Sequence, residues 1–438
     1  MALLFGLGLV RSAGSALRYL GLALSVGWAA TGLATCFALM AGLQPTVPEV
    51  IVLWALLAGA AVTLALRVPA APSRVLRERG SLGRALAFGG AALLVLAIVE
   101  LLRRALASGP LDPDVWSFWL PRAKTIVYFG GIDTGVGGWT GFEHADYPPL
   151  VPTMEAVAFR FMGHIDPLLL PAQHWVIAVG VLAALVGLLA TRVRAAVLWP
   201  SLAMLSFMPA FERMVGSSLG DEALTEMFAL AGACAALWLM EARWRSAALC
   251  GLFLAAGALA KNEGLMLAVV LVLMLVLTGS PRRRWATLLG LAAAPFGALA
   301  PWKIWLWTNH VHTGADYKFH DLFDPGYLSD RIHRLALAAR SLPHSLFDPG
   351  ALLLAVPLAL ALGAVLLAAR RGQRLAAFGV GTIALAFTGY MAIYWIGRPE
   401  IHFYLDSSAG RVVVPIGVFA AVLFPLLVSE ALALGGES

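Results

Sequence analysis

Long apolar runs alternate with shorter polar segments along this chain. The apolar runs reach the ~20 residues that a bilayer crossing needs, and they are continuous rather than alternating, which predicts helices and not strands. The twelve helices that we predict span residues 19–43, 49–67, 85–102, 173–190, 195–210, 223–240, 247–260, 265–278, 286–308, 350–369, 376–396 and 412–431. The sequence therefore predicts an all-α polytopic membrane protein that forms a single domain over residues 1–438.

Three polar segments are much longer than the others, at 103–172, 309–349 and 397–411, and we call them the first, second and third polar segments. All 9 histidines fall on the side of the predicted membrane where these segments lie. Arginine predominates in the short segments on the opposite side, which the positive-inside rule places in the cytoplasm. We therefore predict cytoplasmic N- and C-termini and function on the outer side.

Two amphipathic helices are predicted inside the polar segments. Apolar residues recur at helical spacing over 116–129, with Arg122 and Lys124 between them, and Gly130 follows. A similar pattern runs from Ser329, a suitable N-cap, to Leu342. Such helices are typical of segments that lie along a membrane surface.

Composition agrees with an integral membrane protein and narrows its partners. Hydrophobic residues make up 60% of the chain and charged residues 13%, and the mean hydropathy is +0.83. The net charge of +6 reflects the uneven charge of the two sides, so we expect a lipid bilayer and no nucleic acid as partner. The excess of arginine over lysine favours a bacterial source, and hence the bacterial inner membrane.

The polar segments and span ends carry candidate chemistry, and each candidate has a structural alternative. Asp112 and Asp114 directly follow the third predicted span, where either could act as a general base or cap the next helix. Asp221 begins the sixth predicted span, where a carboxylate also favours a helix N-terminus. Lys261 and Arg411 lie at span ends, where they could hold an anion or extend to the membrane surface.

Several of these residues fall within motifs of a known family. The sequence from Asp114 to Gly130, followed by Tyr147-Pro-Pro-Leu150, resembles the first outer loop of GT-C glycosyltransferases of the protein O-mannosyltransferase and aminoarabinose transferase type. The further matching stretches are 220–228, 261–264 and 410–415. The resemblance covers about residues 85–310 and 397–431. Val115 stands where the family often has glutamate, and Tyr147 where some members have lysine.

The resemblance implies a GT-C-like fold and an inverting glycosyltransferase on the outer membrane face. The donor would be a sugar on a polyprenyl phosphate, and the acceptor a hydroxyl of a glycan, lipid or protein. Asp114 or Asp112 would be the base, and Lys261 and Arg411 would hold the donor phosphate. The remaining substrate contacts that we predict are Asp146, Tyr147, Asp221, Glu263 and His402.

No cofactor is predicted. The second polar segment offers possible ligands for a divalent metal, but their spacing fits no familiar site, so we predict no metal centre. These ligands are His310, His312, Asp316, His320 and Asp321.

Two alternative functions remain open. Twelve spans also suit a secondary transporter, but the predicted spans are nearly free of ionisable residues away from their ends, which favours the enzyme. The other alternative is an O-antigen ligase or polymerase that uses a lipid diphosphate donor.

Overall fold

The protein is described by a computed structural model that covers residues 1–435 apart from 72–74, 77, 79, 110–111, 133–134, 136, 280–284 and 312–315. Every regular element among the described residues is helical. In chain order the elements are α1 (Ala2–Gly6), α2 (Ala13–Arg18), α3 (Leu20–Met40), α4 (Val47–Ala65), α5 (Ser81–Ser108), η1 (Val115–Trp119), α6 (Leu120–Phe129), η2 (Trp139–Gly141), α7 (Leu150–Met162), η3 (Pro167–Leu169), α8 (Leu170–Leu189), α9 (Ala195–Ser206), α10 (Pro209–Val215), α11 (Gly220–Glu241), α12 (Trp244–Ala260), α13 (Glu263–Thr278), α14 (Trp285–Thr308), η5 (Phe319–Phe323), α15 (Pro325–Asp330), α16 (Ile332–Leu346), α17 (Pro349–Leu352), α18 (Ala355–Ala368), α19 (Gln373–Ile396), α20 (Ile401–Val412) and α21 (Val414–Gly435).

The helices match the predicted apolar segments, and the chain is an all-helical, multi-pass membrane protein. Among the described residues, eight helices are long and apolar enough to cross a membrane, and the count is up to ten if each of two bent pairs forms one span. One bent pair is α9 with α10, which meet at 64°. The helices α12 and α13, with 17 and 16 residues, are apolar but short. The number twelve therefore stays a prediction.

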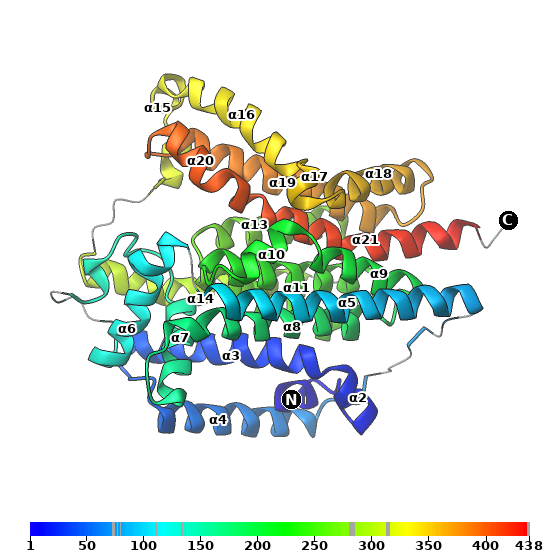
Figure 1. The fold of residues 1–438 in the computed structure, drawn as a ribbon, viewed down its shortest axis with the longest axis horizontal. Helices are drawn as coiled ribbons and strands as arrows, with labels where there is room; N and C mark the ends of the chain where they lie inside the picture. The colour runs from blue at the N-terminus through cyan, green and yellow to red at the C-terminus, as the bar shows by residue number, and fades with distance from the viewer. Residues whose placement is uncertain are drawn as a thin grey trace.

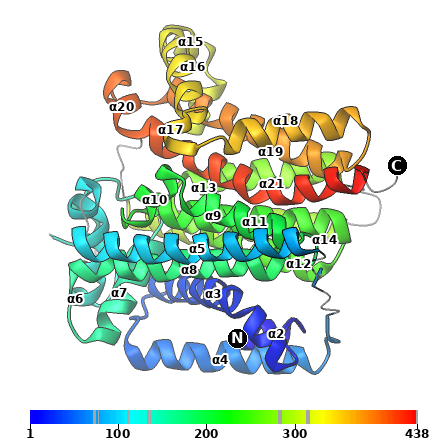
Figure 2. The ribbon, with the colours of Figure 1, turned by 45° about the vertical axis from the view of Figure 1, so that its right-hand side comes forward.

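The helix α11 forms the centre of the bundle. In the most apolar 18-residue stretch of α11, 94% is buried inside the bundle. The corresponding share for α4, at the edge of the bundle, is 11% (Figures 1 and 2). Small residues fill the middle of α11 and allow neighbouring helices to approach closely. At Gly232, a Cβ atom would lie 2.6 Å from the ring of Phe419 on α21, so only glycine permits this contact.

Both ends of the chain lie at the same end of the bundle, next to the C-terminal end of α8. Arg18 donates two hydrogen bonds to the carbonyl oxygen of Gly187, and Ser429 donates one to the carbonyl oxygen of Arg192. Arg192 and Arg243 pair with Glu241 at this end as well.

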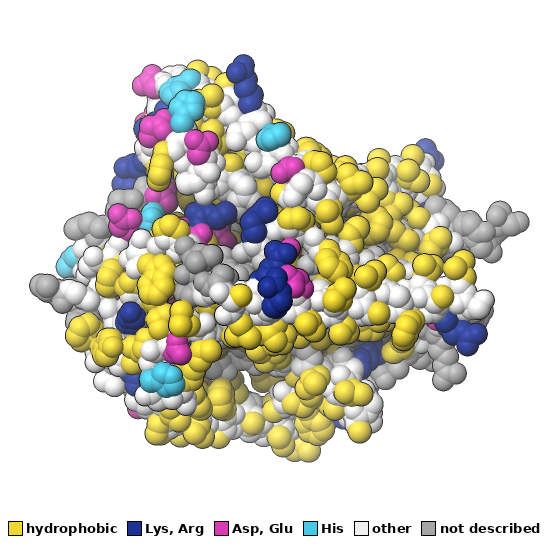
Figure 3. All heavy atoms as spheres, viewed as in Figure 1, with side chains coloured by type: hydrophobic (Ala, Val, Ile, Leu, Met, Phe, Trp, Pro, Cys, Tyr) yellow, Lys and Arg dark blue, Asp and Glu magenta, His cyan; other side chains and the backbone are white. Residues whose placement is uncertain are grey.

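Polar residues gather at the opposite end of the bundle. The helices α6, α15, α16 and α20 lie at this end, and the last three project from it as a lobe (Figures 1 and 2). On the face shown in Figure 3, acidic residues and histidines concentrate over this end and this lobe, while the middle of the bundle is mostly hydrophobic. This arrangement agrees with an apolar belt in lipid and a polar end in water.

Two local predictions are wrong. The predicted helix at 329–342 begins only at Ile332, with Arg331 and not Ser329 before its first residue, because α15 occupies Pro325–Asp330. Arg122 is fully buried, although its spacing suggested a polar helix face. It donates a hydrogen bond to the carbonyl oxygen of Glu143, and burial lowers its pKa to about 10. Gly130 ends α6 in the left-handed conformation, as predicted.

The two ends of the bundle should differ in accessibility. Cys36, Cys234 and Cys250 are buried, so the background from native thiols should be low. A membrane-impermeant maleimide should label Ser329→Cys, at the polar end, in intact cells. It should label Gln373→Cys only after permeabilisation, because the end of the bundle that carries Arg192 and Arg243 (the basic end) is expected to face the cytoplasm. The reverse pattern would place the polar end in the cytoplasm.

Candidate active site

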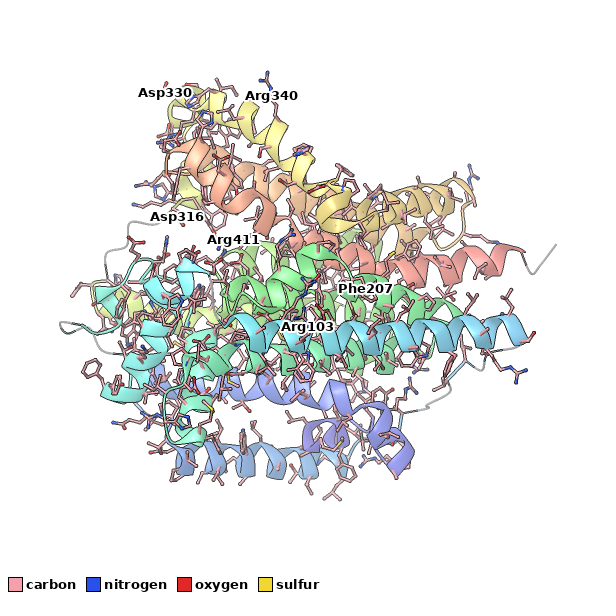
Figure 4. The ribbon with its side chains drawn as sticks, in the orientation of Figure 1. Arg103, Phe207, Asp316, Asp330, Arg340 and Arg411 are labelled. Carbon is pink, nitrogen blue, oxygen red and sulfur yellow. The ribbon has the colours of Figure 1, made fainter. Side chains whose placement is uncertain are left out.

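An ion pair joins the first and third polar segments. Nη1 of Arg411, in α20, lies 2.8 Å from Oδ2 of Asp114 and 3.8 Å from Oδ2 of Asp112. Asp114 and Arg411 are 297 residues apart in the sequence. Figure 4 shows Arg411 between α20 and the central helices. The backbone N–H of Asp114 donates a hydrogen bond to Oδ1 of Asp112, which holds the Asp112 carboxylate against the backbone of Asp114.

A second, more deeply buried ion pair lies beside the first. Nζ of Lys261 is 2.8 Å from Oδ1 of Asp221 and 3.7 Å from Oε1 of Glu263. Lys261 belongs to the two-residue turn between α12 and α13, and Asp221 to the first turn of α11. Burial disfavours the charge of Lys261, but the attraction of Asp221 and Glu263 outweighs it and raises the pKa of the ammonium group.

Two cavities meet at these ion pairs, and Asp221, Ser407 and Arg411 line both of them. The smaller cavity has a volume of about 200 Å³ and the larger about 400 Å³. Charged residues that line only the smaller cavity are Asp114, Glu143, Lys261, Glu263 and Asp316. Those that line only the larger cavity are Asp112, Arg213, Asp348 and Asp406, with His344 beside them.

An aromatic wall closes one side of the smaller cavity. Trp119, from the π-helical turn η1, packs against Gly220, where a Cβ atom would lie 2.5 Å from the indole ring. The ring centroids of Trp119 and Tyr147 are 5.8 Å apart. Tyr147 stacks on His144 at 4.7 Å, and Phe118 meets both rings edge-on. Aromatic surfaces of this kind suit the apolar faces of a sugar ring.

Two carboxyl groups that line the cavities and lie outside the apolar helices have raised pKa values. Burial raises the pKa of Asp112, although nearby Arg411 favours its ionised form. Burial also raises the pKa of Asp316, whose carboxylate lies 3.6 Å from Nδ1 of His144 and accepts a hydrogen bond from Tyr147. Carboxyl groups with raised pKa values are better able to exchange protons near neutral pH.

Most residues predicted for the site from the sequence come together in the structure. Seven of them line the two cavities: Asp112, Asp114, Tyr147, Asp221, Lys261, Glu263 and Arg411. Asp146 lies behind the wall, where its carboxylate accepts a hydrogen bond from Asn262. His402 is exposed on α20 and does not line either cavity, whereas its neighbours Phe403 and Tyr404 line the smaller one.

Sequence reasoning missed several residues. His144, Tyr404 and Ser408 line the smaller cavity, but none has a motif that would single it out. Sequence reasoning also missed ionisable residues that are buried next to the ends of predicted spans. Glu155 of α7 and His174 of α8 are buried, and His174 contacts both Glu155 and Glu222 of α11. The only signal in the sequence is the presence of an ionisable side chain in a mostly apolar helix.

No group of three or more His, Cys, Asp or Glu side chains in the described part of the chain is arranged to hold a metal ion. His312, one of the possible ligands, lies outside the described residues. No protein-family model matches the chain, and no curated protein is significantly similar to it. The functional assignment therefore depends on the motifs and on the geometry of the site.

The contact between Trp119 and Gly220 should be essential to the wall. Gly220→Ala forces a methyl group against the indole and the carbonyl oxygen of Ala260, so we expect a loss of about 1–3 kcal/mol of stability. Gly290→Ala in α14 is the matched control, because nothing lies within 4 Å of its Cβ position. Thermal unfolding of both purified variants measures the difference, and equal melting temperatures would contradict the close packing.

Proposed function

We propose that this protein is a membrane glycosyltransferase of the GT-C type. It would move a sugar from a polyprenyl-phosphate donor to an acceptor hydroxyl on the outer face of a bacterial inner membrane, with inversion at the anomeric carbon. The single observation that best supports the proposal is the meeting of two cavities at Arg411, with carboxylates and cations at their junction. A transferase needs such a junction, because two substrates must meet there.

The charges of the junction suit the proposed reaction. The acceptor oxygen would attack the sugar C1 while its proton passes to Asp114. The bond from C1 to the phosphate oxygen would break, and its electron pair would stay on the departing phosphate. Lys261 and Arg411 are the cations that would stabilise this anion.

The ion pairs also indicate how donor binding could prepare the base. In the structure Arg411 is paired with Asp114, and a carboxylate paired with a guanidinium is a weak base. A donor phosphate would compete for Arg411 and free Asp114 to accept a proton. Asp112, at 3.8 Å from Arg411 and with a raised pKa, is the other candidate for the base.

Specific observations also favour each alternative. Arg213 lines the larger cavity, and this additional cation suits a lipid diphosphate donor, as in an O-antigen ligase or polymerase. Glu155, His174 and Glu222 are buried ionisable residues of the kind that transporters use for proton relays. They lie near the polar end of the bundle, however, and not at the midplane where transporters bind their substrates.

The function can be tested in a deletion strain. Loss of the gene should remove one sugar from a cell-envelope glycan and cause one polyprenyl-phosphate sugar to accumulate. The wild-type protein should reverse both effects, whereas Asp114→Asn should not, since an amide cannot accept the proton and losses of at least about a hundredfold are usual for a general base. Asp112→Asn should retain more activity.

Glycan analysis and lipid mass spectrometry give both readouts, and expression is checked by immunoblot. Accumulation of a diphosphate-linked sugar instead would favour the ligase or polymerase. An unchanged lipid and glycan profile in the deletion strain would contradict any glycosyltransferase function.

Donor use should depend on the two cations. Each charge-assisted contact is worth about 1.5–3 kcal/mol, so Lys261→Gln or Arg411→Gln should raise the KM for the donor roughly tenfold to a hundredfold. The KM for the acceptor should change much less. Arg411→Lys should recover only part of the loss if two nitrogen atoms of the guanidinium bind the phosphate.

Arg340→Gln is the matched control, because Arg340 is exposed on α16. Steady-state kinetics of purified variants in nanodiscs separate the two KM values. If Lys261→Gln and Arg411→Gln both leave donor kinetics unchanged, these residues do not hold the phosphate.

A further inference from the structure

Four ionisable side chains are buried together behind the candidate active site. Glu155 comes from α7, His174 from α8, and Glu222 and Glu226 from α11. None of them is more than 2% exposed, and none lines either of the two cavities. We call this group the His174 cluster. The mechanism proposed above gives it no part.

The imidazole of His174 lies between two carboxyl groups. Its Nδ1 is 3.0 Å from Oε2 of Glu222, and its Nε2 is 3.5 Å from Oε1 of Glu155. Each nitrogen is therefore close to an oxygen, although neither contact has the geometry of a hydrogen bond, and without a proton between the two atoms their lone pairs would repel each other. Either the ring is an imidazolium between two carboxylates, or it is neutral and one glutamate is protonated. Both states place two protons between the three groups.

Glu226 requires a further proton. It is one helical turn below Glu222, and within the described residues it makes no ion pair, while its Oε1 has no hydrogen-bond partner. A buried carboxylate without a partner is strongly disfavoured and takes up a proton instead. The neighbouring negative charge of the Glu155, His174 and Glu222 group acts in the same direction.

We propose that the His174 cluster is a buried proton-binding site that holds three protons among its four side chains. Two lie on the two contacts of His174, and the third is on Glu226. The net charge is then −1, from two carboxylates and one imidazolium with Glu226 neutral. The N-terminal end of α11, where Glu222 is the third residue, is favourable for this charge, because unpaired backbone N–H groups point toward it.

The site has a consequence for the candidate active site, and this second part rests on the proposed function. Glu222 directly follows Asp221, and the two side chains point to different partners, His174 and Lys261. By fixing Glu222 to α7 and α8, the cluster fixes the turn of α11 that presents Asp221 to Lys261. His174 is therefore a positioning residue.

Infrared spectroscopy of the protein in nanodiscs tests the proton count without any activity. The C=O stretch of a protonated carboxyl group is resolved from the stretches of a carboxylate. At neutral pH the wild type should show a buried protonated carboxyl that Glu226→Gln lacks and that the surface variant Asp330→Asn retains. This carboxyl signal should shift only slowly after transfer into deuterium oxide, because the buried proton exchanges slowly with the solvent.

An identical protonated-carboxyl signal in wild type and Glu226→Gln would overturn the proposal. If Glu226→Gln does not fold, Glu226→Asp provides the same test, since its shorter carboxyl should shift the signal and not remove it. A band that is the same in Glu226→Asp and wild type would also contradict protonation of Glu226.

Donor kinetics test the positioning role. His174→Gln should raise the KM for the donor by roughly tenfold while kcat changes less, and its effect should be much smaller in an Asp221→Asn background, because both changes act on one contact. His164→Gln, at an exposed histidine, is the control. Equal effects of His174→Gln in both backgrounds would contradict positioning through Asp221. If no variant and no wild-type preparation transfers sugar, the proposed function fails, while the infrared result still decides the proton site.

Discussion

The need to neutralise buried charge at one end of α11 determines much of this structure. A carboxylate that loses water must gain a cation or a proton, and the first turn of α11 carries two carboxylates in succession. Asp221 meets Lys261, from the turn between α12 and α13, and Glu222 meets His174, from α8. At a more exposed position, Arg411 of the third polar segment pairs with Asp114 of the first. Segments that are far apart in the sequence are held together by these pairs.

The sequence predicts the helices well, because a helix that crosses a lipid bilayer needs a long apolar stretch, and such stretches are easily recognised in the sequence. Each predicted apolar segment is mostly helical, but 195–210 and 350–369 are each split between two helices. The number of crossings depends on such bends, which residue periodicity does not reveal. The grouping of Asp114, Lys261 and Arg411 was predicted from a family resemblance. Composition or spacing alone would not have joined residues 297 positions apart.

The errors have physical reasons of their own. Each helical residue points about 100° away from the next, so a residue in the right segment can face away from the site. His402 is exposed for this reason, while Tyr404 lines the cavity. Arg122 is buried because Phe118 and Trp139 cover its guanidinium, at 5.4 and 4.9 Å from their ring centroids. His174 is a lone histidine in an apolar helix, and only the fold places two carboxyl groups beside it.

The short helix α13 sets the distance between Lys261 and the basic end of the bundle, where Arg192 and Arg243 lie. Its 16 residues rise about 24 Å from the basic end, whereas a hydrocarbon layer is about 30 Å thick. When the basic end is placed at the inner boundary of that layer, Lys261 lies several ångströms below the outer boundary. A lipid anchor could then remain immersed while its head group reaches the ammonium. If the protein uses a lipid-linked donor as proposed, each methylene drawn into water would cost about 0.8 kcal/mol, and a cation below the membrane surface would avoid that cost.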